Sequence, residues 1–455
     1  MLSVVDETED DWQAITALGS WAEFDAFFAE KYIDSECFAS GCTVVVTNAD
    51  GVVHRRRFGG HKDGSIFCVY SVTKIVTTIA CLQLRDAGKL RLDDPLSTHL
   101  PYWLDEARPT EEGVSATPIT IRHALNHTSG LGYYASLDKV LTSPLERAAA
   151  KAKSKIAKTA DLGKFSEWLG RDGPALFEPG AHFGYSDVHT AVAHIVERVS
   201  GMGFEAYLQQ HIFGPLGMVD ATFKSSEAQR ARFNTLRVDT SLIAPSCCLP
   251  CLPRFIPIKQ DLNEAPNMVR GDGGLKGSME DWVKLNCCLL NGGTSKDGVR
   301  ILSAESVAEM CTSSVGGKEL TAPFTYNRGA TMQPDAAMPS FGIHPALLEL
   351  PSGAPLGTRC RWCSHWPGQT VGLGVLVAQD AARATLLDRA AGIAWWVGMG
   401  STCFGFHPEA KVGVLVYGTH ASPLGGAMGG KGRKTTTRLG AFRDTINAAF
   451  HLDRQ

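Results

Sequence analysis

Residues 70–88 read YSVTKIVTTIACLQLRDAG, and this stretch decides the fold. Its apolar residues recur at helical spacing, and Gly88 stands where a helix would end. The pattern predicts a buried helix that begins at Ser71. A serine and a lysine three residues apart at the start of a helix lie on one face, so the ammonium of Lys74 can reach the hydroxyl of Ser71.

This pairing suits nucleophilic catalysis. A serine hydroxyl is a poor nucleophile unless a base removes its proton. Apolar neighbours could lower the pKa of Lys74 by desolvation, and the helix N-terminus favours negative charge where an oxyanion would develop. A lone S-x-x-K pattern is nevertheless common, and most matches to it arise by chance.

A second signal is Tyr185, in the stretch PGAHFGYSD at 179–187. A phenol held near a lysine cation can have a lowered pKa and act as a general base toward Ser71. Taken alone, Tyr185 is more often a core aromatic residue whose hydroxyl is hydrogen-bonded.

Three motifs in chain order resemble those of class C β-lactamases, D-alanyl-D-alanine carboxypeptidases and family VIII carboxylesterases. They are Ser71-x-x-Lys74, Tyr185-Ser186-Asp187 and Trp396-Val397-Gly398. Four further stretches resemble the same family: Gly88–Pro95, His127–Leu131, Phe213–Met218 and Gly271–Leu275. The similarity covers roughly residues 20 to 450.

The resemblance implies a role for each matched residue. Ser71 would be acylated, with Lys74 and Tyr185 as the proton relay. The backbone N–H groups of Ser71 and Met399 would form the oxyanion hole. Asp187, Trp396, Gly398 and Met399 would contact the substrate, with Trp396 to Gly398 on a strand that borders the cleft. His127 is expected to have a structural role.

Two departures from the family pattern bear on the substrate. β-Lactamases usually carry Lys-Thr-Gly as the third motif, and Trp396 and Val397 replace its cation and hydroxyl here. An apolar border favours an uncharged ester over a lactam that bears a carboxylate. Asp187 stands where the family commonly has Asn, and an acid beside Lys74 would keep that lysine charged and favour Tyr185 as the base.

The expected fold is α/β (α+β) and β-lactamase/transpeptidase-like. N- and C-terminal strands would form one antiparallel sheet flanked by helices, with an inserted and mostly helical lobe. We expect a single catalytic domain over 1–455, with the α/β lobe at about 20–88 and 365–455 and the helical lobe at about 89–364. The residue patterns predict hairpin strands at 41–59, strands in 369–378, 392–400 and 411–418, and helices near 21–28, 188–201, 278–290 and 439–450.

Composition indicates which classes of binding partner to expect. A formal net charge of -3 gives no reason to expect nucleic acid, and a small-molecule ester or amide is the expected substrate. No run long enough for a membrane span and no signal peptide are apparent, and an odd count of 13 cysteines favours reduced thiols, so a cytoplasmic location is expected. No cofactor and no metal are expected. Oligomeric state cannot be read from the sequence.

Two weaker patterns have simpler interpretations. Gly425-x4-Gly430-Lys431 approaches a phosphate-binding loop but has Gly432 in place of Ser/Thr, so 422–438 is interpreted as a surface loop. The pairs Cys248/Cys251 and Cys360/Cys363 have zinc-knuckle spacing but lie too far apart in sequence for a zinc ribbon, which favours thiols.

The main hypothesis is therefore a serine hydrolase that forms an acyl-serine intermediate, acting as a carboxylesterase or acyltransferase on small esters. One alternative is a β-lactamase or D-alanyl-D-alanine carboxypeptidase. Another is a catalytically silent scaffold of the same fold.

Overall fold

The computed structural model describes most of the chain. The described residues are 13–34, 38, 40–103, 108–110, 113–132, 161–173, 175, 177–234, 236–239, 255–258, 269–318, 369–378, 391–398, 400–421 and 438–452. Met399, both cysteine pairs with CxxC spacing and the loop 422–437 lie outside them.

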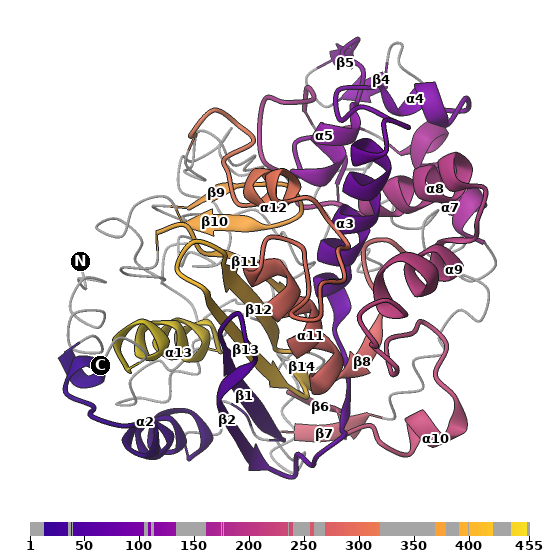
Figure 1. The fold of residues 1–455 in the computed structure, drawn as a ribbon. Helices are drawn as coiled ribbons and strands as arrows, with labels where there is room; N and C mark the ends of the chain where they lie inside the picture. The colour runs from indigo at the N-terminus through magenta and orange to yellow at the C-terminus, as the bar shows by residue number, and fades with distance from the viewer. Residues whose placement is uncertain are drawn as a thin grey trace, which may run out of the picture.

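A seven-stranded sheet forms the centre of the molecule (Figure 1). Its strands occur in the order β2-β1-β13-β12-β11-β10-β9, and each is antiparallel to its neighbours. β1 and β2 come from the N-terminal part of the chain and the other five from the C-terminal part, which confirms the expected sheet. The strand bounds are β1 Gly41–Thr47, β2 Val52–Gly59, β9 Gln369–Val371, β10 Leu376–Ala378, β11 Ala394–Gly398, β12 Thr402–His407 and β13 Val412–Gly418.

The remaining elements are mostly helices, and those from α3 to α12 lie in sequence between these two groups of strands. The helices are α2 Trp21–Phe28, α3 Thr73–Asp86, α4 Leu96–His99, α5 Ile121–Leu125, α7 Leu162–Asp172, α8 His189–Ser200, α9 Phe204–Leu208, α10 Glu227–Arg230, α11 Met279–Leu290, α12 Ala304–Met310 and α13 Arg438–Leu452. The small sheets contain β3 Ile66–Cys68 with β8 Lys276–Ser278, β4 Arg108–Thr110 with β5 Gly113–Ser115, and β14 His420–Ala421 with β6 Leu236–Asp239 and β7 Phe255–Ile258.

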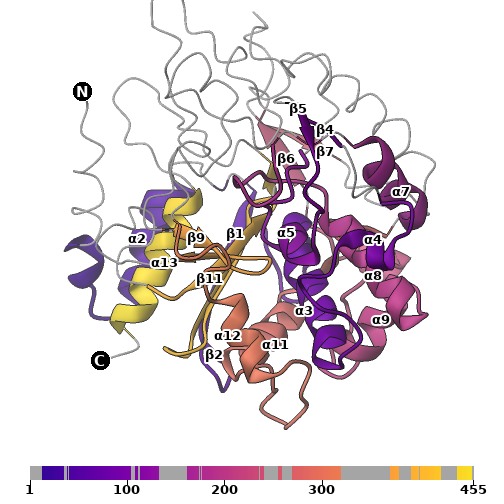
Figure 2. The ribbon, with the colours of Figure 1, turned by 90° about the horizontal axis from the view of Figure 1, so that it is seen from above.

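The main sheet lies between two helical layers. α2 and α13 cover one face and α11 contacts the other, as the view from above shows (Figure 2). α3 lies beyond α11 in this second layer and packs against α8 and α9. The division of the chain into two lobes remains a prediction.

Helix α3 begins two residues later than the sequence predicted. Ser71 lies in a short 3-10 helix, Tyr70–Val72, and the α-helix starts at Thr73. Tyr70 has φ 48°, a left-handed conformation that an α-helix cannot accommodate at this point. The hydroxyl of Thr73 donates to the Tyr70 carbonyl at 2.6 Å and caps the turn.

The C-terminal strands differ in detail from the prediction. Residues 369–378 form two strands, because Gly374 turns the chain with φ 69° and β9 then pairs with β10. The strand β12 was missed, because Thr402 and Gly405 interrupt its apolar pattern although every residue of β12 is buried.

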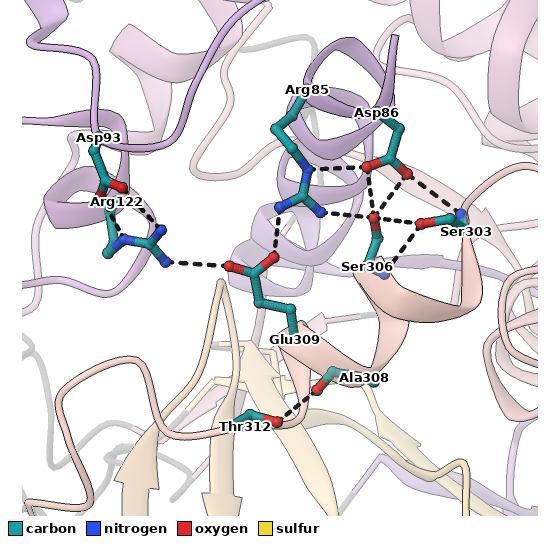
Figure 3. A network of polar contacts seen from close by, with 9 residues as sticks. All are labelled: Arg85, Asp86, Asp93, Arg122, Ser303, Ser306, Ala308, Glu309 and Thr312. Carbon is teal, nitrogen blue, oxygen red and sulfur yellow. Dashed lines mark hydrogen bonds and ion pairs between the residues drawn. The ribbon is translucent and has the colours of Figure 1, made fainter. Parts of the chain in front are cut away.

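A polar network joins α3 to two other helices (Figure 3). The guanidinium of Arg85 donates to Glu309 at 2.5 Å and to Ser306 at 2.7 Å, both on α12. Glu309 also accepts from Arg122 of α5 at 3.2 Å, and Arg122 reaches Asp93 at 2.7 Å. The C-terminal half of α3 is thereby tied to α12 and α5. Within the described ranges, no helix is both long enough and apolar enough to cross a bilayer.

Candidate active site

Ser71 stands at the junction between β3 and α3. The backbone N–H of Val69 donates to the Leu275 carbonyl at 3.0 Å, which anchors the segment just before the serine. Ser71 is partly exposed, while Lys74, one turn along, is 0% exposed. Part of Ser71 is therefore accessible to solvent, and the ammonium of Lys74 is enclosed by protein.

Three predicted side chains meet at hydrogen-bonding distance. Ser71 Oγ lies 2.6 Å from the Tyr185 hydroxyl oxygen. Lys74 Nζ lies 2.7 Å from that hydroxyl and 3.3 Å from Ser71 Oγ. Because an ammonium has three donors, the remaining one reaches the backbone carbonyl of Asp272 at 2.7 Å. The lysine is thus fixed between two hydroxyls and one carbonyl.

Tyr185 is supported from behind by aromatic rings. His127 lies 5.0 Å from its ring, and Trp396 of β11 stacks on His127 at 5.3 Å with the planes 10° apart. His127 Nδ1 accepts from the backbone N–H of Ser186 at 3.3 Å. Burial lowers the pKa of His127 well below its ordinary value, so the ring is neutral. The structural role expected for His127 remains a prediction.

Gly398 lets β11 approach the serine segment closely. A Cβ at this position would lie 2.4 Å from the Val69 carbonyl oxygen and 2.3 Å from Thr402 Oγ1. Gly400 is similar, because its Cβ would lie 2.3 Å from the Tyr70 ring. A side chain at either position would displace the turn that carries Ser71. Met399, the predicted second oxyanion-hole donor, lies outside the described residues.

Asp187 has a partner that the sequence analysis did not identify. The partner is Arg270. The side chain of Asp187 is 0% exposed, and its Oδ1 lies 3.3 Å from Arg270 Nη2. Arg270 also makes two hydrogen bonds to the carboxylate of Asp272, from Nε at 2.8 Å and from Nη2 at 2.6 Å. The sequence signal for Arg270 and Asp272 was the stretch Gly271–Leu275, which resembles the family. Asp272 lies in this stretch, and Arg270 directly precedes it.

A comparison with protein families decides the classification. A family model described as Beta-lactamase matches residues 29–431 of this chain. The chain belongs to the Beta-lactamase family. This confirms the resemblance inferred from the three motifs.

Relatives of this Beta-lactamase family member include named enzymes. Esterase EstB of Burkholderia gladioli is 33% identical over 191 residues, which cover 41% of this chain and 46% of EstB. Monacolin J acid methylbutanoyltransferase of Aspergillus terreus is 35% identical over 164 residues, which cover 34% of this chain and 37% of the transferase. Among solved structures, EstCE1, a hydrolase with promiscuous acyltransferase activity, covers 98% of this chain with a TM-score of 0.64 at 19% identity. That likeness supports the Beta-lactamase fold.

Proposed function

We propose that this member of the Beta-lactamase family is a serine hydrolase with esterase or acyltransferase activity on small, uncharged esters, and that Ser71 carries the acyl group. Family membership and the esterase and acyltransferase relatives support the enzyme class and a small-molecule substrate. The observation that carries the proposal is the meeting of Ser71, Lys74 and Tyr185 within 2.6 to 3.3 Å.

Tyr185 is the group that takes the proton from Ser71. Its hydroxyl oxygen is 2.6 Å from Ser71 Oγ, whereas Lys74 Nζ is 3.3 Å away. The Lys74 ammonium donates to the phenol oxygen at 2.7 Å, which stabilises a phenolate electrostatically. Lys74 thus orients Tyr185 and supplies the charge, and Tyr185 is the immediate base.

The reaction is a two-step acyl transfer. Ser71 Oγ attacks the ester carbonyl carbon while its proton passes to Tyr185, and the carbonyl oxygen becomes an oxyanion next to the N-terminal end of α3. The C–O bond to the alcohol then breaks, and Tyr185 returns the proton to the departing alkoxide. Water or a second alcohol attacks the acyl-serine by the same route, which releases an acid or a new ester and restores Ser71.

An uncharged substrate fits the strand beside the serine. Trp396 and Val397 are 4% and 5% exposed, and neither offers a cation to a substrate carboxylate. β-Lactamases usually have a lysine and a threonine in that motif. We therefore expect esters of neutral acids and alcohols to react faster than carboxylate-bearing lactams. The cytoplasmic location remains an expectation.

Replacement of the serine tests the proposal. Ser71→Ala should lower kcat/KM for p-nitrophenyl acetate and butyrate by at least about 1,000-fold, because the variant lacks the hydroxyl that carries the acyl chain in this mechanism. Ser200→Ala is the matched control, since that serine ends α8 and its hydroxyl donates to the Val196 carbonyl and accepts from the Met202 backbone N–H. An unchanged rate in Ser71→Ala would remove Ser71 from the reaction. A chromogenic cephalosporin and added alcohols, offered to the wild-type protein, distinguish lactam hydrolysis and acyl transfer from ester hydrolysis.

A further inference from the structure

Arg270 contacts two buried carboxylates, those of Asp187 and Asp272. Asp187 is 0% exposed, and the side chain of Asp272 is 3% exposed. Arg270 contacts both, and its guanidinium also lies over the Phe165 ring of α7 at 5.8 Å. Thr190 of α8 adds a hydrogen bond to Asp272 Oδ1 at 2.8 Å. The guanidinium therefore connects the turn before α8 to the segment that precedes β8.

The same segment holds the lysine of the site. The backbone carbonyl of Asp272 accepts from Lys74 Nζ at 2.7 Å, and the neighbouring Gly271 carbonyl accepts from Thr77 of α3 at 2.7 Å. A Cβ on Gly271 would lie 2.1 Å from the His189 carbonyl oxygen, so this segment is pressed against α8. Movement of Asp272 would therefore shift the carbonyl that orients Lys74.

With Tyr185 as a neutral phenol, the formal charges of the groups around Lys74 and Arg270 balance, and the phenolate form of Tyr185 adds one negative charge. Two carboxylates, Asp187 and Asp272, contact the Arg270 cation, and the Lys74 ammonium donates to the backbone carbonyl of Asp272 in the same segment. The other titratable groups that face them from the described elements are Tyr185, His127 after α5 and His189 of α8. Burial lowers the pKa of both histidines well below the ordinary value, so neither adds a charge. Removal of either charge of the Asp187–Arg270 pair changes the net charge of this region, which includes Lys74, by one unit.

We propose that Arg270 is a positioning residue that clamps Asp187 and Asp272 together and, through the Asp272 backbone, holds Lys74 against Tyr185 and Ser71. This inference rests on the proposed function of those three side chains. It also explains why position 187 holds an acid, where the family commonly has Asn. Arg270 is needed to fix Asp272, and Asp187 neutralises the charge of the Arg270 guanidinium. Asp187 and Arg270 form a charge-matched pair.

A double-mutant cycle with pH profiles separates this role from simple structural support. The variants are Arg270→Gln, Asp187→Asn and their combination, with Arg171→Gln of α7 as the control for loss of a surface arginine. The readout is kcat/KM for p-nitrophenyl butyrate against pH, together with the thermal midpoint of each variant. Arg270→Gln removes a positive charge from the region around Lys74, so the midpoint of the acid limb should rise by about one pH unit. Asp187→Asn should lower it by a similar amount, and the double variant should return close to the wild-type value.

Arg270→Lys separates charge from geometry. Lysine keeps the charge but lacks the planar fork that contacts both carboxylates. The acid-limb midpoint should therefore stay near that of the wild type, while kcat falls at least about 10-fold. If Arg270→Gln does not fold, Asp187→Asn and Arg270→Lys still test the inference, through the acid-limb midpoint and kcat.

Two results would overturn the inference. One is a set of acid limbs that superimpose for the wild type and all folded variants. The other is a double variant whose midpoint shift equals the larger single shift. Failure of the proposed function is a separate outcome. It would appear as ester turnover in Ser71→Ala at the rate of the wild type.

Discussion

Tyr70, Gly398 and Gly400 determine how Ser71 is presented. Tyr70 adopts φ 48°, and a left-handed conformation costs a non-glycine residue about 1 kcal/mol or more. The two glycines leave room for its side chain and backbone, since a Cβ on either would lie within 2.4 Å of the 69–70 segment. The strained turn is thus held in place by the close approach of Gly398 at the end of β11 and of Gly400. This explains why a glycine ends the third motif.

Gly398→Ala tests this explanation at one residue. The added methyl group would overlap the Val69 carbonyl, so the serine segment must shift, which is expected to destabilise the fold by about 1 to 3 kcal/mol. Ester kcat should fall at least about 10-fold, because misplacement of a nucleophile by about 1 Å is costly. Gly60→Ala is the matched control, since nothing lies within 4 Å of its added Cβ. Equal activity in the two variants would show that the close approach of β11 does not matter.

Among the secondary-structure elements, α3 links the candidate active site to the polar network of α12 and α5. Its N-terminal turn carries Lys74 directly after the 3-10 turn of Ser71, and its C-terminal turn contributes Arg85 to the polar network with Glu309 and Arg122 (Figure 3). Both ends of the helix are therefore fixed by contacts to other elements. The sequence predicted the buried face of α3 but not this network, because the partners of Arg85 on α12 lie more than 200 residues away in the chain.

Glu309→Gln tests how strongly the network fixes α3. The carboxylate accepts from Arg85 and Arg122 and is about one-third exposed, so its loss should lower the free energy of unfolding by about 1 kcal/mol. Glu305→Gln, an exposed position on the same helix, should cost less. Chemical denaturation of both variants checks this. A Glu309→Gln variant as stable as Glu305→Gln would mean that the network adds nothing.

At the scale of the whole molecule, the central sheet combines strands from opposite ends of the chain. The sequence was sufficient for this arrangement, because β1, β2 and β13 have clear runs of apolar or β-branched residues. It was sufficient for the meeting of Ser71, Lys74 and Tyr185, because their motifs have a fixed order. It was insufficient for Arg270, because the approach of one guanidinium to Asp187, 83 residues earlier, depends on how α8 packs against the 270–275 segment.

The structure and the family membership lead to one chemical claim: an acyl group is transferred to Ser71, and Tyr185 takes the proton. The most direct measurement is mass spectrometry of peptides after a rapid acid quench of the protein mixed with p-nitrophenyl butyrate. The account predicts a butyryl adduct on the peptide that contains Ser71, at a level that falls at least about 100-fold in Tyr185→Phe. Ester turnover with no adduct on that peptide, or an adduct that forms equally fast in Tyr185→Phe, would contradict it.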